Sequence, residues 1–543
     1  MNGSNPKLLA DLRRPVETLL AAGGDSRLCL DPRTGLGKYG CATRPRPATL
    51  PFGSCTASSV SAAGFEAACR LHRRLLAVDD EASLRASVGE RLDAVRDELG
   101  FLLTRSAVAG VQVALTPSGT DAELIALALT RGSEGAPITN ILVGPTEIGS
   151  GSALAAAAKH FDRLTPNGAE RRPGEAVDEA MADVIELVNV WLRRDDGAIR
   201  PEHELDAEIE GHVHAHLARG RRVLLHVVAH SKTGLHAPSL DAVNRLRARY
   251  GDRIQVVIDA AQGRFSRRGL VEVLEQGHIV LVTGSKFFGG PPFCGALLVP
   301  ANAHPNAVGL STLPAGFADY FTADQLPREW RRLRACLPET GNVGLLLRWT
   351  AALAEMREYY GTPSQLRLRV LRAFEHLAPR ILSSSACIDV EPTSAPILSD
   401  DFARVLQSKA TVFSFSVKGP DGRRFDAEAL REIWCWLNED VSDRLGEASE
   451  RERLALAASV HTGQPVAVTR ESTGPALLRC AIGGVLVAEV AQDPDWGARL
   501  EDRLAGLESA IESLKLKIEI IARHHARMTS GGRGPSEARR LAS

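Results

Sequence analysis

A single lysine stands between two strongly apolar segments of this chain. Lys286 lies within VLVTGSKFFGGPPFCGALLVP, residues 280–300, and both flanking segments have the composition of buried strands. A buried lysine costs free energy unless its charge is paired or its amine takes part in chemistry. An amine removed from water can lose its proton near neutral pH and form a Schiff base. The alternative is a loop lysine whose ammonium reaches solvent.

Three further polar motifs follow apolar segments in the same way. The motif SGT (118–120) follows VQVAL, HSKTG (230–234) follows RVLLHVVA, and DAAQ (259–262) follows RIQVVI. Each motif taken singly has a structural explanation, because serine and threonine also cap ordinary helices. Together with Lys286 they supply hydroxyl and N–H donors, a carboxylate and an amine. Pyridoxal 5′-phosphate requires that set for its phosphate, its pyridine nitrogen and its aldehyde, so the sequence predicts this cofactor.

The elements that must hold these motifs alternate along the chain. Apolar runs rich in β-branched residues, each followed by a helical pattern, recur between residues 111 and 300. Such alternation predicts an α/β fold, with a mostly parallel sheet that has helices on both faces. The carboxyl ends of parallel strands lie along one edge of the sheet, where ligands bind in this class of fold. The motifs are therefore expected to meet in one crevice.

Changes in pattern divide the chain into four parts. An N-terminal helix and an irregular arm are expected over residues 1–50, and a large cofactor-binding domain over 51–345. Long helices around short strands then predict a smaller C-terminal α+β domain over 346–527. The polar tail, 528–543, is expected to be disordered.

The amino-acid composition indicates which classes of partner and which cellular compartment are expected. The 65 basic and 66 acidic residues leave a net charge of −1, so neither a nucleic acid nor a membrane is expected as a partner. The nine cysteines are dispersed, which favours a reducing cytoplasm. The N-terminus predicts an amphipathic helix rather than a signal peptide, and no apolar run has membrane-spanning length. The histidines of GHVHAHL are expected on a solvated helix, so no metal is predicted.

The motifs resemble those of fold type I pyridoxal-phosphate enzymes, nearest to the class V aminotransferase and cysteine desulfurase group. DAAQ resembles D-A-x-Q, whose aspartate pairs with the pyridinium nitrogen and whose glutamine bonds the ring hydroxyl. TGSK (283–286) resembles S-x-H-K, SGT resembles S-G-A-T, and HSKTG resembles H-N-P-T-G. ETGNVGLLLRW (339–349) resembles a loop that lends a threonine to the phosphate in the partner subunit, which implies a homodimer with shared sites. The resemblance makes Lys286 and Asp259 catalytic, and it assigns cofactor binding to Ser118, Gly119, Thr120, His230, Ser231, Asp259, Gln262, Thr283, Ser285, Lys286 and Thr340.

The resemblance also implies where a substrate binds. LLRCAIGG (477–484) resembles L-R-V-S-L-G, whose arginine binds the α-carboxylate of the substrate; an arginine that bridges the two domains is the alternative. FGSCTASS (52–59) resembles a segment that borders the substrate. Where the family has a histidine or an aromatic ring over the cofactor, this chain has Glu147, Ile148 and Gly149. The candidates for substrate binding are Arg479, Tyr39, Cys55, Thr56 and Glu147.

The resemblance indicates an enzyme that acts on an α-amino acid through an external aldimine and a Cα carbanion. The expected reaction is an elimination, a substitution or carbon–carbon bond chemistry. Residues 446–478 contain no cysteine for a desulfurase loop, so persulfide chemistry is not expected. An aminotransferase is the alternative. A non-catalytic sensor on the same fold is a third hypothesis, disfavoured because the chain has no obvious helix-turn-helix segment and retains both Asp259 and Lys286.

Overall fold

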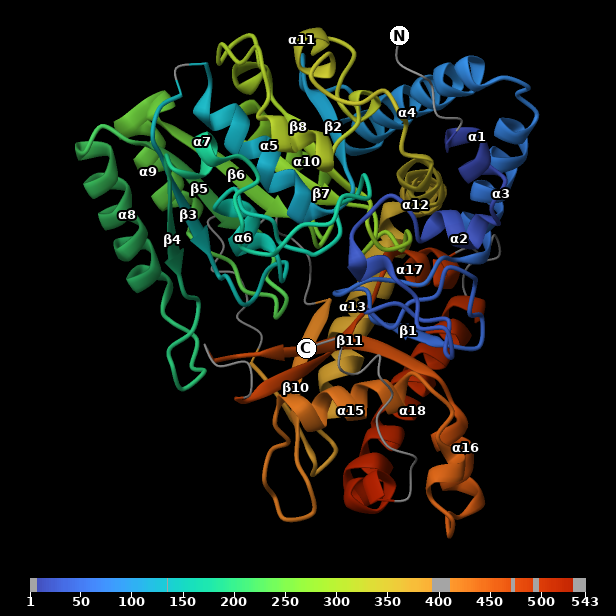
Figure 1. Cartoon of the computed structure of the whole chain (residues 1–543). Helices are drawn as coiled ribbons and strands as arrows, with labels where there is room; N and C mark the ends of the chain where they lie inside the picture. Colours follow the sequence, from blue (N-terminus) through green and yellow to red (C-terminus); the bar gives the residue numbers. More distant parts are fainter. Residues whose placement is uncertain (1–6, 134, 393–410, 470–473, 492–497, 531–543) are drawn as a thin grey trace.

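The larger of two sheets carries the predicted motifs. The computed structural model describes residues 7–133, 135–392, 411–469, 474–491 and 498–530. The larger sheet has the strand order β2-β8-β7-β6-β5-β3-β4 (Figure 1). β8 is antiparallel to both neighbours and the other neighbouring pairs are parallel, which confirms the predicted mostly parallel sheet. The strands are β2 (Gln112–Thr116), β3 (Ile138–Val143), β4 (Ile185–Val190), β5 (Arg222–Val228), β6 (Ile254–Ala260), β7 (Ile279–Thr283) and β8 (Gly295–Val299).

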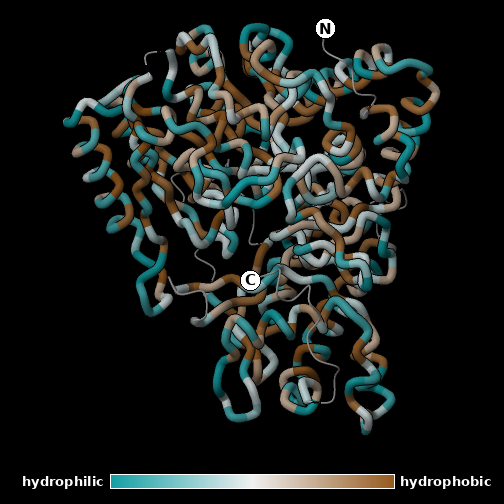
Figure 2. The backbone as a smooth tube through the Cα atoms, in the orientation of Figure 1, coloured by the Kyte–Doolittle hydropathy of each residue, from teal (hydrophilic) through white to brown (hydrophobic). Residues whose placement is uncertain are grey.

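Alternate residues of these strands face two layers of helices. Leu224 and Leu281 pack with helix α5 (Gly119–Arg131) on one face. Their sequence neighbours Leu225 and Val280 belong to a separate core on the other face, with residues of α4, α8, α9 and α10. Burial on both faces explains why the strands are continuous apolar runs, and it confirms the predicted helices on both faces. Figure 2 shows these apolar segments inside the molecule and hydrophilic segments in the outer loops.

The remaining helices of this part of the chain connect and cover the strands. They are α3 (Ala62–Leu76), α4 (Glu81–Thr104), α6 (Ser152–Ala156), α7 (Glu179–Ala182), α8 (Glu202–Ala218), α9 (Leu240–Tyr250), α10 (Arg267–Glu275), α11 (Arg331–Arg334) and α12 (Val343–Gly361). Short 3₁₀ helices cover Ser26–Leu28, Gly251–Arg253, Ala301–Ala303, Ala315–Asp319 and Ala323–Gln325.

The second sheet has five strands in the order β1-β11-β12-β10-β9. Neighbouring strands are antiparallel except β1 and β11, which run parallel. Residues of α13, α15 and α18 form one apolar core with this sheet, which matches the predicted α+β part. The strands are β1 (Leu50–Phe52), β9 (Ile388–Val390), β10 (Val412–Val417), β11 (Val460–Ala467) and β12 (Ala476–Ala481). The helices are α13 (Ser364–Leu382), α15 (Ala427–Leu437), α16 (Glu450–Ala457), α17 (Gly484–Ala491) and α18 (Ala498–Ser530), with a 3₁₀ turn at Ser442–Arg444.

The N-terminal segment contributes to both parts. Pro15 separates two short helices, α1 (Lys7–Leu12) and α2 (Val16–Leu20), because proline cannot continue a helix that precedes it. Both helices place leucines in a core that also contains residues of the larger sheet. Strand β1, by contrast, pairs with β11 of the smaller sheet. The domain boundaries expected at residues 50 and 345 stay predictions.

Two segments differ from their predicted extent. The helical pattern GSALAAAAKHF (151–161), one of those that follow the apolar runs, forms a helix only over Ser152–Ala156. Ala158 has a φ of 54°, in the left-handed region that cannot continue an α-helix. Helix α18 continues to Ser530, so the start of the tail expected to be disordered is helical. The rest of that tail, 531–543, lies outside the described residues. No helix within the described part of the chain is long and apolar enough to cross a membrane.

Candidate active site

Three neighbouring strands bring the predicted motifs to one edge of the larger sheet. Asp259, near the end of β6, lies beside Val228 at the end of β5 and beside Leu281 of β7. β7 ends at Thr283, and Lys286 follows in the connection to β8. β5, β6 and β7 are neighbouring parallel strands of the larger sheet (Figure 1). Their carboxyl ends lie at the same edge, which places Asp259 and Lys286 there.

Lys286 and Asp259 influence each other's protonation. Burial lowers the pKa of the Lys286 amine, and the charge of Asp259 opposes that shift. Burial raises the pKa of the Asp259 carboxyl, while the charge of Lys286 and a hydrogen bond from the N–H of Ala261, 3.0 Å long, act against it. The amine is therefore easier to deprotonate than a lysine in water, as a nucleophile requires.

Gln262, predicted to bond the ring hydroxyl, and His230, a further predicted cofactor ligand, are largely buried. The Gln262 amide donates to the carbonyl of Cys55, 2.9 Å away. Its Oε1 is buried and accepts no hydrogen bond from the described residues. A buried acceptor without a donor is costly, so this oxygen suits a hydroxyl group supplied by a ligand. The ring of His230 packs edge-on against His236, with centroids 4.3 Å apart, and burial keeps its pKa well below the usual range.

Several of the predicted cofactor ligands lie at or near the start of α5. Ser118 caps this helix, and its hydroxyl accepts from the N–H of Thr120 at 3.2 Å. A Cβ at Gly119 would lie 3.5 Å from Thr283 Cγ2, so the helix start and the end of β7 are in contact. The Ser285 side chain is buried, and among the described residues its hydroxyl has no hydrogen-bond partner. Hydroxyl groups at a helix N-terminus form a suitable site for a phosphate.

Arg27 lies beside the hydroxyl groups at the start of α5, which together with it form a candidate phosphate cradle. This position of Arg27 was not predicted from the sequence. Its guanidinium lies 3.3 Å from Thr120 Oγ1 and 3.4 Å from Ser118 Oγ. Asp25 pairs with it at 2.6 Å, and the ring of Phe293 lies 4.8 Å below. Both charged side chains are buried. The residue lies in the irregular arm, where no periodicity or motif in the sequence indicates a contact with residues more than ninety positions away.

Glu147 has internal partners that account for its charge. Its carboxylate forms an ion pair with Arg193 at 2.7 Å and accepts from Ser231 at 2.6 Å and from Thr233. The side chain is 1% exposed. It therefore holds the loop after β5 in place, and the predicted cofactor ligand Ser231 is engaged with Glu147. The sequence contains no signal for this pair, since Glu147 and Arg193 are 46 positions apart.

Arg479 enters the site from the smaller sheet. It lies on β12, is 1% exposed, and donates to Thr56 Oγ1 at 2.8 Å and to the carbonyl of Lys232 at 3.1 Å. It also donates to the carbonyl of Gln464. No carboxylate lies within ion-pair distance of Arg479 in the described part of the chain. A buried guanidinium bonded only to neutral acceptors can still bind an anionic ligand.

Cys55 and Tyr39 flank this arginine and the phosphate cradle, respectively. A Cβ at Gly463 would clash with Cys55 Sγ and lie 3.1 Å from Arg479 Nε, so the thiol and the guanidinium pack on the same glycine. Tyr39 lies in the arm with its ring centroid 6.3 Å from that of Phe293. Burial raises the pKa of the Tyr39 hydroxyl, and the charge of Arg27 opposes this shift.

Thr340 occupies a different environment from the other assigned residues. It precedes α12 and is exposed in the single chain, whereas the others are buried or half-buried. Its hydroxyl forms no hydrogen bond within the described residues. An exposed position is compatible with a role in the site of a second subunit, and that role stays a prediction.

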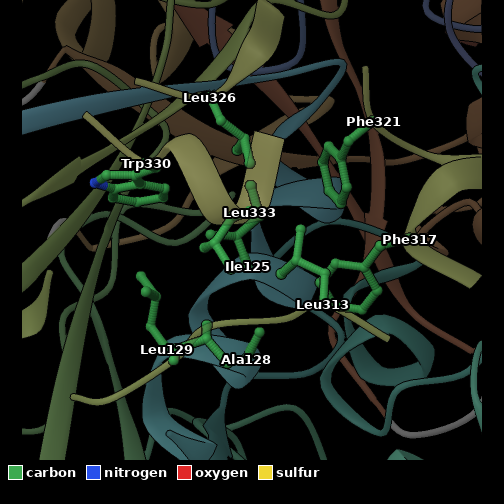
Figure 3. Close-up of a pocket in the computed structure, with 10 residues that line it drawn as sticks. Ile125, Ala128, Leu129, Leu313, Phe317, Phe321, Leu326, Trp330 and Leu333 are labelled. Carbon is green, nitrogen blue, oxygen red and sulfur yellow. The ribbon is translucent and has the colours of Figure 1, made fainter. Parts of the chain in front are cut away.

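A small apolar pocket against α5 has no group for such chemistry (Figure 3). No titratable side chain lines it, so it is not a candidate active site. Its lining residues are Ile125, Ala128, Leu129, Leu310, Leu313, Phe317, Phe321, Leu326, Trp330 and Leu333. Over the described ranges, no group of three or more histidine, cysteine and acidic side chains could hold a metal ion.

Comparisons with known proteins rest on structure. No protein-family model matches the chain, and no curated protein matches its sequence. The complex of the cystine C-S lyase C-DES with cysteine persulfide is 14% identical, with a TM-score of 0.50 over 86% of this chain and 97% of that one. Mouse CSAD is 14% identical, with a TM-score of 0.47 over 86% and 83%. Rhodiola rosea 4-hydroxyphenylacetaldehyde synthase is 12% identical, with a TM-score of 0.45 over 88% and 84%. The strand order of the larger sheet in this chain, together with the chain's likeness to the C-S lyase, shows the fold type I architecture of pyridoxal-phosphate-dependent enzymes.

Proposed function

We propose that the protein is a pyridoxal-phosphate-dependent enzyme that acts on an α-amino acid. The observation that carries this proposal is that Asp259 and Lys286 lie at the ends of adjacent strands, where the charge of each acts on the other. The buried Oε1 of Gln262, which follows the same strand as Asp259 and is unpaired among the described residues, supports it. When bound, the cofactor supplies an electron sink for negative charge at the substrate Cα. The residues present fit it, because they offer an amine, a carboxylate, a lone acceptor and a helix N-terminus.

Each residue has a role that follows from its chemistry. Asp259 would hold a proton on the pyridine nitrogen, and Gln262 Oε1 would accept from the ring hydroxyl. The N-terminus of α5 and Arg27 would bind the phosphate. Lys286 would anchor the cofactor and move the proton at the substrate Cα. Arg479 would orient the substrate through its carboxylate.

The reaction that we favour is elimination, substitution or carbon–carbon bond chemistry. The solved C-S lyase with the same fold acts on cystine, and this likeness supports bond cleavage in an amino acid. Transamination is the alternative, and accumulation of pyridoxamine phosphate in a single turnover would identify it. Because one fold hosts many chemistries, the assignment of reaction type rests on that measurement.

Borohydride treatment of the cofactor-loaded protein is expected to fix the cofactor on Lys286. Its lowered amine pKa and its position beside Asp259 make it the expected nucleophile. Peptide mapping by mass spectrometry measures the labelled position. Lys232 provides the internal control, because the charge of Lys286 acts on its amine and the two lysines are therefore near each other. A label on Lys232, or no label, would contradict the proposed function.

Mixed dimers are expected to recover activity that each parent variant lacks. If Thr340 serves the partner's site, a dimer of Lys286→Ala and Thr340→Ala subunits has one site with both changes and one with neither. Random pairing gives such dimers in half of the molecules, so activity should approach about a quarter of the wild-type value. Turnover of the mixture is compared with the mean of the two parents. A mixture no more active than that mean would refute shared sites.

A further inference from the structure

Lys232 is a second lysine in the site that the proposed function does not use. Its main chain is held on both sides, because its N–H donates to the carbonyl of Glu147 at 2.7 Å and its carbonyl accepts from Arg479 at 3.1 Å. The peptide group of Lys232 therefore contacts the arginine that we assign to the α-carboxylate. The position of this lysine relative to Arg479 is thus set by direct hydrogen bonds.

The ammonium group of Lys232 has few partners. It donates to the carbonyl of Thr146 at 3.2 Å, although an ammonium group carries three N–H donors. No carboxylate of a described residue lies within ion-pair distance of it. The side chain is half-buried. A cation in such a place is stabilised when a ligand supplies an anionic acceptor.

The surrounding charges leave this cation without an anion of its own. Burial and then the positive charges of Arg479 and Lys286 lower the pKa of Lys232 to about 7, and Glu147 opposes them. Glu147 is already paired with Arg193 at 2.7 Å. The α-carboxylate of the substrate would pair with the charge of Arg479, and the negative charge of Asp259 acts on Lys286. One positive group therefore remains beside the place where the substrate would lie.

We propose that Lys232 binds a second anionic group of the substrate, so that the substrate is an α-amino acid with an acidic side chain. The inference rests on the proposed function and narrows its substrate class. Arg479 and Lys232 would hold the two ends of the molecule, and Lys286 would reach the carbon between them. An anion in the site would also favour the charged form of Lys232.

The test compares ligands that cannot react. Calorimetry on the cofactor-loaded protein measures the dissociation constants of succinate, glutarate and adipate, and of butyrate, pentanoate and hexanoate. At least one dicarboxylate should bind about 10- to 100-fold more tightly than the monocarboxylate of the same chain length. Lys232→Met should abolish this preference and leave monocarboxylate binding unchanged, while Lys232→Arg should retain most of it. Lys159→Met is the matched control, because Lys159 is exposed.

If the wild-type protein binds dicarboxylates and monocarboxylates with equal affinity, the inference is overturned. This comparison uses no variant, so misfolding of a variant does not affect it. A dicarboxylate preference that persists in Lys232→Met would also overturn it. So would loss of turnover in Lys232→Met with no dicarboxylate preference in the wild type, because that result indicates proton transfer by Lys232. Failure of the proposed function is separate, since it appears as absence of the cofactor from Lys286 before any carboxylate is added.

Discussion

Lys286→Ala is expected to lower turnover of an α-amino acid by about 10²- to 10⁴-fold, the range for loss of a positioned acid–base group. The amine is the group that both anchors the cofactor and moves the proton at the substrate Cα in the proposed mechanism. Its lowered pKa means that it can act below the pH at which a lysine in water loses its proton. Turnover is measured with excess cofactor, so that weakened binding does not hide the chemical step.

Two controls separate chemistry from folding in this experiment. Lys159→Ala removes an exposed lysine and should leave turnover unchanged. Added methylamine should restore part of the activity of Lys286→Ala, because a free amine can enter the space left by the side chain. Turnover of Lys286→Ala close to the wild-type value would show that another group carries the proton.

Arg479→Ala is expected to lower kcat/KM for the amino acid substrate by roughly 30- to 5,000-fold, equivalent to about 2–5 kcal/mol for a charge pair lost from a closed site. Arg479→Lys should rescue poorly, because an ammonium group does not reproduce the planar fork of a guanidinium. The decarboxylated amine of the same substrate should be affected far less, since it has no α-carboxylate to bind.

The bridging role of Arg479 makes a second arginine necessary as a control. Arg479 joins β12 to the loop after β5 through the carbonyl of Lys232. Arg264 bridges in a similar way, donating to Ser54 Oγ at 2.8 Å and to the carbonyl of Ile482 at 3.1 Å. Arg264→Met should lower the melting temperature and affect amino acid and amine equally. The same pattern in Arg479→Ala would mean that it only joins the two parts.

The residues that sequence reasoning could find are those whose position follows from a strand. Asp259 and Lys286 each follow an apolar run, and the geometry of a parallel sheet places such residues at one edge without knowledge of the rest of the chain. The position of Ser118 at the start of a helix can be inferred from the same rule, because serine is a favoured helix cap. These inferences need only local patterns, and the strand register confirms the edge that they predict.

The residues that were missed depend on contacts between distant irregular segments. Arg27 reaches Thr120 from the arm, and Arg193 reaches Glu147 from the connection after β4. Loop conformation decides such pairs, and loops lack the periodicity from which elements are inferred. The role predicted for Thr340 would require a second copy of the chain, so the structure of one subunit does not test it.

The pairing of β1 with β11 has a consequence for the order in which the protein can be made. Leu50 pairs with Val460, so the two partners are 410 positions apart (460 − 50). At a ribosomal rate of about 5–20 residues per second, the first strand waits roughly 20–80 s for its partner to be synthesised. During that time the strands of the larger sheet can already assemble, whereas Cys55 and Thr56 cannot meet Arg479. A nascent chain therefore acquires the edge that would hold the cofactor before it acquires the wall that would hold the substrate.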